Sequence, residues 1–313
     1  MLRTAALTAA ALACFAANSL LARSALGAGL ADPATFTAVR LAAGALALPL
    51  IAALAGRGRP SGGSWGSALA LFVYAAAFSL AYLRIGAGPG ALLLFAAVQA
   101  TMLGWSILHG QRPSAVQWLG VALALGGLAF LTLPGARGSL GAVDPLGAML
   151  MLSAGVAWGA YSLRGRAARD PIATTAANFL RASVLAVPMA LALAPRLEAR
   201  PSGILLAVLS GALASGVGYS IWYAAVPRLG ATRAATVQLA VPVLTAAAAG
   251  ALLGERLTGR LALSAVAILG GIALSMRPAS AGRTLLLRTT ARPGHGALAP
   301  PAGRAHPSAG RKA

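Results

Sequence analysis

The chain has few of the groups that acid–base, redox or metal chemistry needs. Of its 313 residues only 5 are Asp or Glu, 3 are His and 1 is Cys. A single cysteine, Cys14, excludes intramolecular disulfides and thiolate metal sites. No acid falls within an apolar segment, and His109, His295 and His306 lie at a segment end or beyond the last segment. We therefore expect no metal site and no cofactor, and we do not expect an enzyme.

Negative charge is scarce, whereas positive charge is abundant but scattered. The chain carries 25 Lys and Arg residues and a formal net charge of +20. Seven of these lie after residue 276, and most of the others stand singly or in pairs in short loops, where basic residues set membrane topology. The basic face with interleaved aromatics that suits nucleic acid is missing. The expected partners are a lipid bilayer and a small-molecule substrate, with no nucleic acid.

Apolar residues dominate what remains. The chain is 58% hydrophobic and 10% charged, with a mean hydropathy of +0.79. Soluble chains carry about a quarter charged residues, so an integral membrane protein is indicated. Apolar segments of about 20 residues can cross a bilayer core. We expect ten such helices, at residues 4–22, 34–55, 65–83, 89–108, 115–133, 144–163, 172–194, 202–224, 231–253 and 259–276.

The sequence repeats itself once. A hinge, Gly254-Glu255-Arg256, is followed by the glycine pair Gly270-Gly271, and a similar hinge and pair occur 144 residues earlier, at Gly110-Gln111-Arg112 and Gly126-Gly127. This predicts two five-helix repeats, at 1–136 and 137–277. Residues 278–313 have the Pro, Gly, Ser and Arg composition of a disordered basic tail.

An odd number of spans in each repeat has a topological consequence. The second repeat must enter the membrane inverted, which predicts an all-α integral membrane fold of ten transmembrane helices in two inverted repeats. Such folds bind substrate near the midplane, where the halves meet. With the N-terminus inside, the internal segments and the tail hold sixteen basic residues and the external loops seven. Both termini are therefore expected to be cytoplasmic.

Several motifs of this repeat are familiar. The run Pro242-Val-Leu-Thr, the run Leu-Leu-Gly-Glu-Arg ending at Arg256, and Trp158-Gly159 resemble the drug/metabolite transporter superfamily, and more narrowly its EamA-type exporters. In the first half Val98 and Phe15 replace the proline and the tryptophan. The resemblance implies a ten-helix fold in the bacterial inner membrane that moves amino acids, other small metabolites or drugs, often outward.

Polar side chains inside the expected spans are the first candidates for substrate binding, because polar groups are costly in lipid. Asn18 lies in the first span, Gln99 in the fourth and Gln238 in the ninth. Each of them has an alternative role, which is to form a hydrogen bond between helices.

Two arginines occupy comparable places in the repeats. Arg40 and Arg181 lie seven and ten residues after Pro33 and Pro171, and no acid within a span can neutralise them. They are expected to face a hydrated cavity and attract a substrate carboxylate. Snorkelling to an interface is the alternative, and it applies more strongly to Arg40, which is closer to its helix end.

Aromatic residues make up only 5% of the chain and are concentrated. Trp158 and Tyr161 share one helix face and are candidates for an amphipathic pocket. An interfacial belt at headgroup level is the alternative. We expect the belt for the residues near span ends, which are Trp65, Tyr82, Trp118, Trp222 and Tyr223.

The hinge Gly254-Glu255-Arg256 is expected to be structural. Glu255 beside Arg256 suggests a local ion pair or cap that fixes the angle between the last two spans. A proton-coupling role for Glu255 remains open, because it requires burial that the sequence does not specify.

These features predict a secondary transporter that works by alternating access, and the resemblance implies that it exports small organic metabolites, such as amino acids or related compounds, or drugs. A non-transporting structural or sensor protein of the membrane is one alternative, and a membrane-embedded enzyme is another. The chain has no nucleotide-binding loop for ATP-driven pumping. The scarcity of buried acids also weakens carboxylate-based proton antiport and leaves facilitated diffusion or exchange open.

Overall fold

The computed structural model describes residues 2–54, 56, 60–110, 113–132, 143–165, 168–192, 198–229 and 237–275. Within these ranges the regular structure is helical, apart from one isolated β-bridge between Ala31 and Ala199. All of them belong to one compact unit. Gln111 and Arg112 of the first predicted hinge lie outside the described residues, as does the predicted tail at 278–313.

Five helices form from the first five apolar segments, and their bounds match the expected spans within a few residues. They are α1 (Leu2–Gly27), α2 (Pro33–Leu54), α3 (Trp65–Tyr82), α4 (Ala87–Leu108) and α5 (Ala115–Thr132). Proline occupies the first position of α2, where its missing N–H costs nothing. Ser64 caps α3 by accepting a hydrogen bond from the backbone N–H of Ser67 at 3.1 Å.

The remaining segments are also helical, but the eighth is not a uniform α-helix. It divides into α8 (Pro201–Val208), the π-helical η2 (Leu209–Val217) and α9 (Gly218–Leu229). In η2 the Ser215 hydroxyl donates to the carbonyl of Ser210 at 2.9 Å, five residues back. The other helices are α6 (Pro145–Gly165), α7 (Pro171–Ala192), α11 (Ala240–Leu253) and α12 (Gly259–Ser275).

Four of the five acids in the chain lie at helix N-termini. Asp32, Asp144 and Asp170 accept hydrogen bonds from the first backbone N–H groups of α2, α6 and α7, at 2.6 to 3.1 Å. Glu255 accepts from the N–H of Ala87 at the start of α4, at 2.9 Å. The free N–H groups and the helix dipole both favour a carboxylate there. Four of the five carboxylates therefore cap helix N-termini rather than lie in the core.

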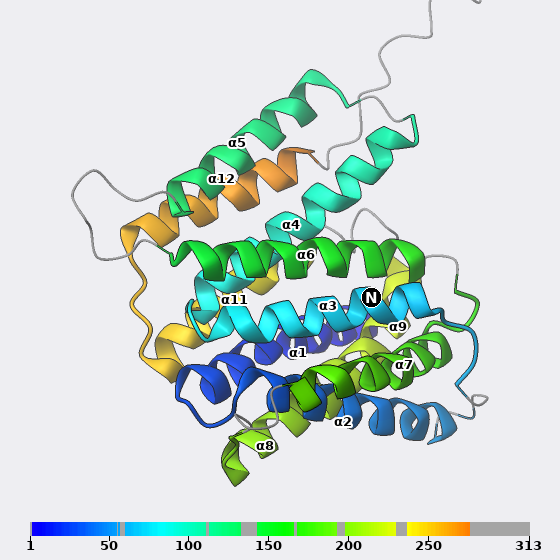
Figure 1. Cartoon of the computed structure of the whole chain (residues 1–313). Coiled ribbons are helices and arrows are strands. Elements are labelled where there is room, and N and C mark those ends of the chain that lie inside the picture. The colour runs from blue at the N-terminus through cyan, green and yellow to red at the C-terminus, as the bar shows by residue number, and fades with distance from the viewer. Residues whose placement is uncertain are drawn as a thin grey trace, which may run out of the picture. The chain divides into compact units, whose positions relative to one another are not determined.

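Glycine brings helices together where the sequence repeats. A Cβ on Gly120 of α5 would meet the backbone of Gly271 in α12 at 2.5 Å, and the reverse holds for Gly271. A Cβ on Gly155 or Gly159 of α6 would likewise collide with α4. Small residues allow such close approach between helices in membranes. In Figure 1, α5 and α12 lie side by side, and α4 runs from them into the other helices.

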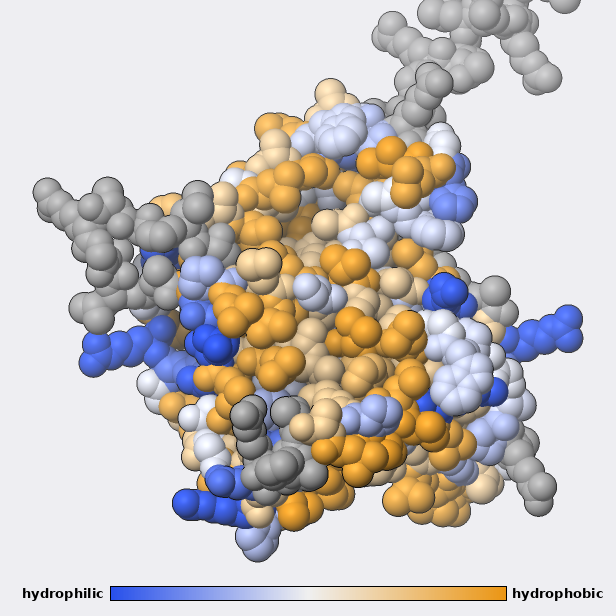
Figure 2. Space-filling model, in the orientation of Figure 1, coloured by the Kyte–Doolittle hydropathy of each residue, from blue (hydrophilic) through white to orange (hydrophobic). Residues whose placement is uncertain are grey.

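Large apolar side chains cover the outer faces of the helices. Leu46, Leu119 and Val266 are 75%, 63% and 73% exposed. Figure 2 shows hydrophobic residues over the middle of the visible face and hydrophilic ones toward its two sides. Seven of the described helices are long and apolar enough to cross a membrane, and α5, α11 and α12 are shorter apolar helices. A surface of this kind is suited to contact with lipid.

Candidate functional site

A cavity of about 350 Å³ lies among α1, α3, α4, α6, α9 and neighbouring segments. It extends from the middle of α1 and α3 to Gly165 and Pro171, beside one end of the helices. This volume falls in the range of small-molecule sites. Its lining comprises Phe15, Asn18, Ser19, Tyr74, Phe78, Leu94, Phe95, Gln99, Met102, Trp158, Tyr161, Ser162, Gly165, Pro171, Ala214, Tyr219, Trp222, Tyr223 and Gln238.

Five of the seven residues that the sequence proposed for substrate binding meet in this cavity. They are Asn18, Gln99, Trp158, Tyr161 and Gln238, from three helices (α1, α4 and α6) and the segment before α11. Both sequence halves therefore contribute to the lining. Most of the surface is apolar or aromatic, and a few amide and hydroxyl groups interrupt it, as is usual in sites for small organic molecules.

Trp158 is the centre of an aromatic cluster along the cavity wall. Its ring centroid lies 4.9 Å from that of Tyr74, 5.4 Å from Tyr161 and 5.2 Å from Tyr219. Phe15 extends the cluster through edge contacts with Tyr219 and Trp222, at 5.9 and 5.7 Å. Each such pair adds about 0.5–1.5 kcal/mol beyond its buried area, and the ring faces make the wall suited to flat apolar groups.

A chain of hydrogen bonds crosses four elements at the deep end of the cavity. The Ser210 hydroxyl of η2 donates to Asn18 Oδ1 at 2.6 Å, and Asn18 Nδ2 donates to Tyr74 Oη at 3.2 Å. Arg40 Nη2, from α2, donates to the same Tyr74 oxygen at 2.9 Å. Asn18 and Tyr74 therefore connect the cavity to an arginine that lies behind its wall.

Arg40 is a buried cation with only part of its hydrogen-bonding capacity used. It is 1% exposed, and its Nε and Nη1 have no hydrogen-bond partner among the described residues. Its guanidinium lies 5.0 and 4.8 Å from the ring centroids of Tyr74 and Phe78. Cation–π contacts of this kind offset only part of the cost of burying a charge. Arg40 does not snorkel to an interface, because it faces these two rings.

The backbone beside Arg40 leaves no room for a side chain on η2. A Cβ on Gly211 would overlap the carbonyl oxygen of Arg40, and it would approach Ala43 Cβ to 3.0 Å. Gly211 therefore allows α2 and η2 to touch at the level of the guanidinium. Departures from regular α-helix are frequent at functional sites, and here the π-helical turn also presents Ser210 to Asn18.

Arg181 lies outside this cavity, which differs from the expectation that it would face one. Its Nη1 donates to the carbonyl of Gly62 at 3.1 Å and to that of Ala177 at 3.3 Å. Asn178, one turn earlier, accepts from the backbone N–H of Ser64 at 3.0 Å. The segment before α3 therefore folds against α7, and its Gly62 carbonyl accepts a hydrogen bond from the Arg181 guanidinium. The comparable sequence positions of Arg40 and Arg181 do not give them comparable surroundings.

Of the five aromatic residues expected in an interfacial belt, two are exposed and three are not. Trp65 and Trp118 are 58% and 52% exposed. Tyr82 is fully buried, and Trp222 and Tyr223 line the cavity, so the belt assignment was wrong for these three. Tyr82 packs edge-on against Phe78 at 4.7 Å. Neighbouring helices cover these span ends, which distance from the end of an apolar run does not reveal.

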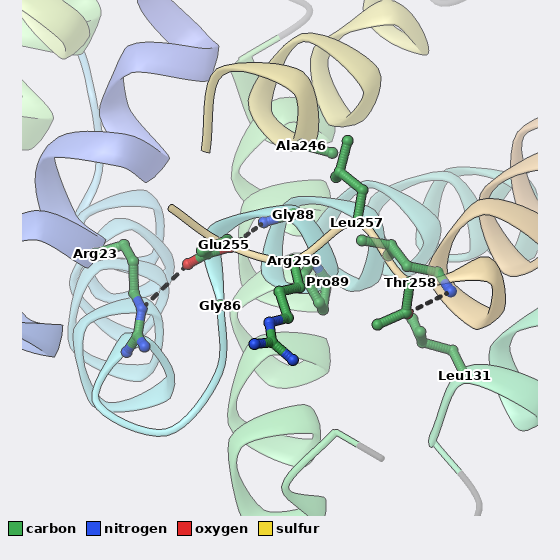
Figure 3. Close-up of a pocket in the computed structure, with 11 residues that line it drawn as sticks. Arg23, Gly86, Gly88, Pro89, Leu131, Ala246, Glu255, Arg256, Leu257 and Thr258 are labelled. Atoms are coloured by element: carbon green, nitrogen blue, oxygen red, sulfur yellow. Dashed lines mark hydrogen bonds and ion pairs between the residues drawn. The ribbon is translucent and has the colours of Figure 1, made fainter. Parts of the chain in front are cut away.

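The hinge after α11 forms a second, smaller pocket of about 230 Å³, shown in Figure 3. Glu255 makes an ion pair with Arg23 Nε at 3.3 Å, and Arg23 Nη1 also donates to the carbonyl of Tyr82 at 2.9 Å. Arg256 points in another direction, so the expected local pair between Glu255 and Arg256 is corrected to a pair with Arg23. Glu255 thus links α1 and the start of α4 to the hinge.

Gly254 explains how the chain turns at this hinge. It caps α11 in the left-handed conformation, with φ of +65°, and a Cβ at this position would be strained. The turn directs the Glu255 carboxylate toward α4. Among the residues that the structure describes, no three His, Cys, Asp or Glu side chains gather as a metal site would require.

Comparison with known proteins places this architecture among membrane transporters. Residues 145–277 match the EamA-like transporter family. The chain is 51% identical to the uncharacterised protein PA1977 of Pseudomonas aeruginosa, over 88% of this chain and 95% of that protein. It is 34% identical to the threonine/homoserine exporter RhtA of Salmonella typhimurium, over 59% of this chain and 60% of the exporter.

A solved structure shares the fold. One crystal structure aligns with a TM-score of 0.63 at 22% identity, over 86% of this chain and 98% of that one. At this identity the likeness concerns the fold alone. The helix arrangement is therefore not peculiar to this chain.

Proposed function

The chain belongs to the EamA-like transporter family of the drug/metabolite transporter superfamily, and on that premise we propose that it exports small organic metabolites as a secondary transporter. Amino acids and related compounds are the first substrate class to test, because RhtA is a threonine/homoserine exporter. It is a multi-pass membrane protein, and we assign it to the bacterial inner membrane.

The observation that carries this proposal is the central cavity. Asn18 and Gln99 from the first half of the chain and Trp158, Tyr161 and Gln238 from the second half line one space of about 350 Å³. A substrate in this space would touch both halves at once. Movement of one half against the other would then change the substrate's access, which is how alternating access operates in transporters with repeats.

We further propose that the ten helices form two inverted repeats, at residues 1–136 and 137–277, followed by a basic tail at 278–313. The helix contacts support this division. In a two-fold arrangement α2 is equivalent to α7 and α5 to α12, and each of these pairs is in contact. The contact of α3 with α6 is matched by that of α1 with α8, η2 and α9. Both α2 and α7 begin at a proline and contain another, Pro49 and Pro188.

The two ends of the cavity differ in a way that supports alternating access. Toward Gly165 and Pro171 the lining reaches the ends of α6 and α7. At the opposite helix ends Glu255 pairs with Arg23, and the segment before α2 binds the segment before α8, with Asp32 N–H donating to the Glu198 carbonyl at 2.8 Å. With both termini in the cytoplasm, this arrangement is open inward and closed outward.

Flux through the purified protein tests the proposal. The full chain in liposomes loaded with labelled threonine, homoserine and a panel of other amino acids should release at least one compound faster than empty liposomes. Gln99→Ala, at the cavity, should lower this flux, whereas Gln117→Ala on α5, which does not line the cavity, should not. Absence of flux for every compound, with a correctly folded protein, would overturn the assignment.

A further inference from the structure

Arg40, the buried cation near the cavity, has no counter-charge among the residues that the structure describes. Asp32, Asp144, Asp170 and Glu255 accept hydrogen bonds from N–H groups at helix starts, and Glu198 is exposed. All five acids are described, and two of them form ion pairs elsewhere, Glu255 with Arg23 and Asp144 with Arg84. Among the described residues Arg40 instead donates one hydrogen bond, to Tyr74. A buried charge without a partner costs several kcal/mol, so a ligand that supplied the missing charge would be strongly favoured.

Tyr74 connects this cation to the cavity. Its oxygen accepts hydrogen bonds from Arg40 Nη2 and Asn18 Nδ2, and both of these nitrogen atoms can only donate. A phenol oxygen has two acceptor positions and one hydrogen. With both acceptor positions used, the hydrogen is left for a separate acceptor, and Tyr74 lines the cavity. The hydroxyl is therefore a donor directed at the substrate space, polarised by the guanidinium behind it.

The rest of the lining determines what kind of molecule could meet this donor. The lining contains no acid, and Trp158, Tyr161 and Tyr219 offer apolar ring faces. A cationic amine without an acidic group would be repelled by Arg40. An ammonium that accompanies a carboxylate could instead rest on an aromatic face.

We propose that the cavity selects organic acids. The substrate carboxylate accepts the hydrogen bond of the Tyr74 hydroxyl and is balanced by Arg40, while the remainder of the molecule packs against the rings around Trp158. This inference rests on the proposed function, since it takes the cavity to be the substrate site. It adds a specificity that transport alone does not require, because the carboxylate is essential and an amine is optional.

A series of compounds that share one phenyl ring isolates this requirement. 3-Phenylpropionate has only the carboxylate, L-phenylalanine has both charges, L-phenylalaninamide lacks the carboxylate, and phenethylamine has only the ammonium. Binding to the full chain in lipid nanodiscs is measured by isothermal titration calorimetry. The two acids are expected to bind at least tenfold more tightly than the amide and the amine.

Two variants test whether Arg40 causes the preference for acids. Arg40→Met keeps the length of the side chain and removes the charge, and it should abolish the preference for acids. Because it also removes an unpaired buried charge, its melting temperature without ligand should equal or exceed that of the wild type, so that loss of folding does not explain the result. Arg84→Met removes an exposed arginine outside the cavity and should keep the preference.

Asn18→Asp is a second, independent test. The new carboxylate would accept the Tyr74 hydrogen and supply the missing negative charge inside the protein. Acid binding should then fall at least tenfold although Arg40 is intact. Retained acid binding in this variant would contradict the role of the Tyr74 hydroxyl.

The results separate this inference from the proposed function. Equal binding of acid and amide to the wild type, binding of neither acid, or a preference that survives Arg40→Met would overturn the inference. Flux of compounds without a carboxylate at rates equal to those of their acids would overturn it while leaving transport intact. Selective acid binding without flux in liposomes would instead support it and overturn the transporter assignment.

Discussion

Glu255 and Arg23 are 232 residues apart in the chain, and their side chains form an ion pair of 3.3 Å. The same carboxylate accepts the N–H of Ala87, so it joins the hinge after α11 to both α1 and α4. A single residue thus connects the two halves of the sequence, at the helix ends opposite Gly165 and Pro171. Separation of these helices would have to break this contact.

A double-mutant cycle measures the interaction free energy between Glu255 and Arg23. Glu255→Gln and Arg23→Gln should each lower the free energy of unfolding, because Glu255 also caps α4 and Arg23 also donates to the carbonyl of Tyr82. The coupling between the two should be about 1 kcal/mol, since both side chains are partly exposed. Unfolding in a denaturing detergent provides the measurement. Strict additivity of the two variants would show that the pair contributes nothing.

Gly211 is predicted to be intolerant of any side chain. Gly211→Ala places a methyl group on the carbonyl of Arg40 and should destabilise the protein by about 1–3 kcal/mol through overpacking. Gly270→Ala is the matched control, because a Cβ at this helical position in α12 meets nothing within 4 Å. A lower melting temperature for the control than for Gly211→Ala would contradict the close contact of α2 with η2.

Trp158 is predicted to contribute to ligand affinity rather than only to stability. Trp158→Ala removes ring contacts with Tyr74, Tyr161 and Tyr219 and should weaken binding of L-phenylalanine at least tenfold in calorimetry. Trp65→Ala, at an exposed helix start, should bind it as the wild type does. Equal affinities for the two variants would exclude the aromatic wall from the binding site.

Arg181 and Arg40 are predicted to respond to substitution in opposite ways. Arg181→Ala loses a charged hydrogen bond to Gly62 and should lower stability by about 1–3 kcal/mol, with substrate affinity unchanged. Arg40→Met should lower affinity without lowering stability. Melting curves and titrations on both variants provide the comparison. A loss of affinity in Arg181→Ala at unchanged stability would instead place Arg181 in the substrate path.

The helices were largely predictable from sequence because hydrophobicity alone determines them. Apolar runs bounded by Asp-Pro, Gly or Arg placed α2, α6 and α7 within a few residues of their ends. The polar and aromatic residues at mid-span also gave five members of the cavity. A polar group inside a membrane span is energetically costly, so its presence points to a binding or packing role even in a single sequence.

Contacts between distant segments could not be predicted in the same way. Arg181 resembled Arg40 in its position after a proline. In the structure, however, the segment at Gly62–Ser64 folds against α7 and accepts a hydrogen bond from Arg181. Glu255 forms its ion pair with Arg23 rather than with its sequence neighbour Arg256. The donor role that we propose for the Tyr74 hydroxyl depends on Asn18 and Arg40, which both donate to its oxygen. Each of these depends on which helix faces which, and helical periodicity does not fix that.

The absence of acids from the described lining has an energetic consequence for the transporter that we propose. A carboxylate substrate without an ammonium group, such as 3-phenylpropionate, is an anion, and the interior of a bacterium is electrically negative. The membrane potential favours outward movement of one negative charge by about 2.3 kcal/mol per 100 mV, which corresponds to roughly a fiftyfold concentration ratio. Export of an anion is therefore electrogenic and downhill, and a simple uniporter could perform it without a proton-carrying side chain.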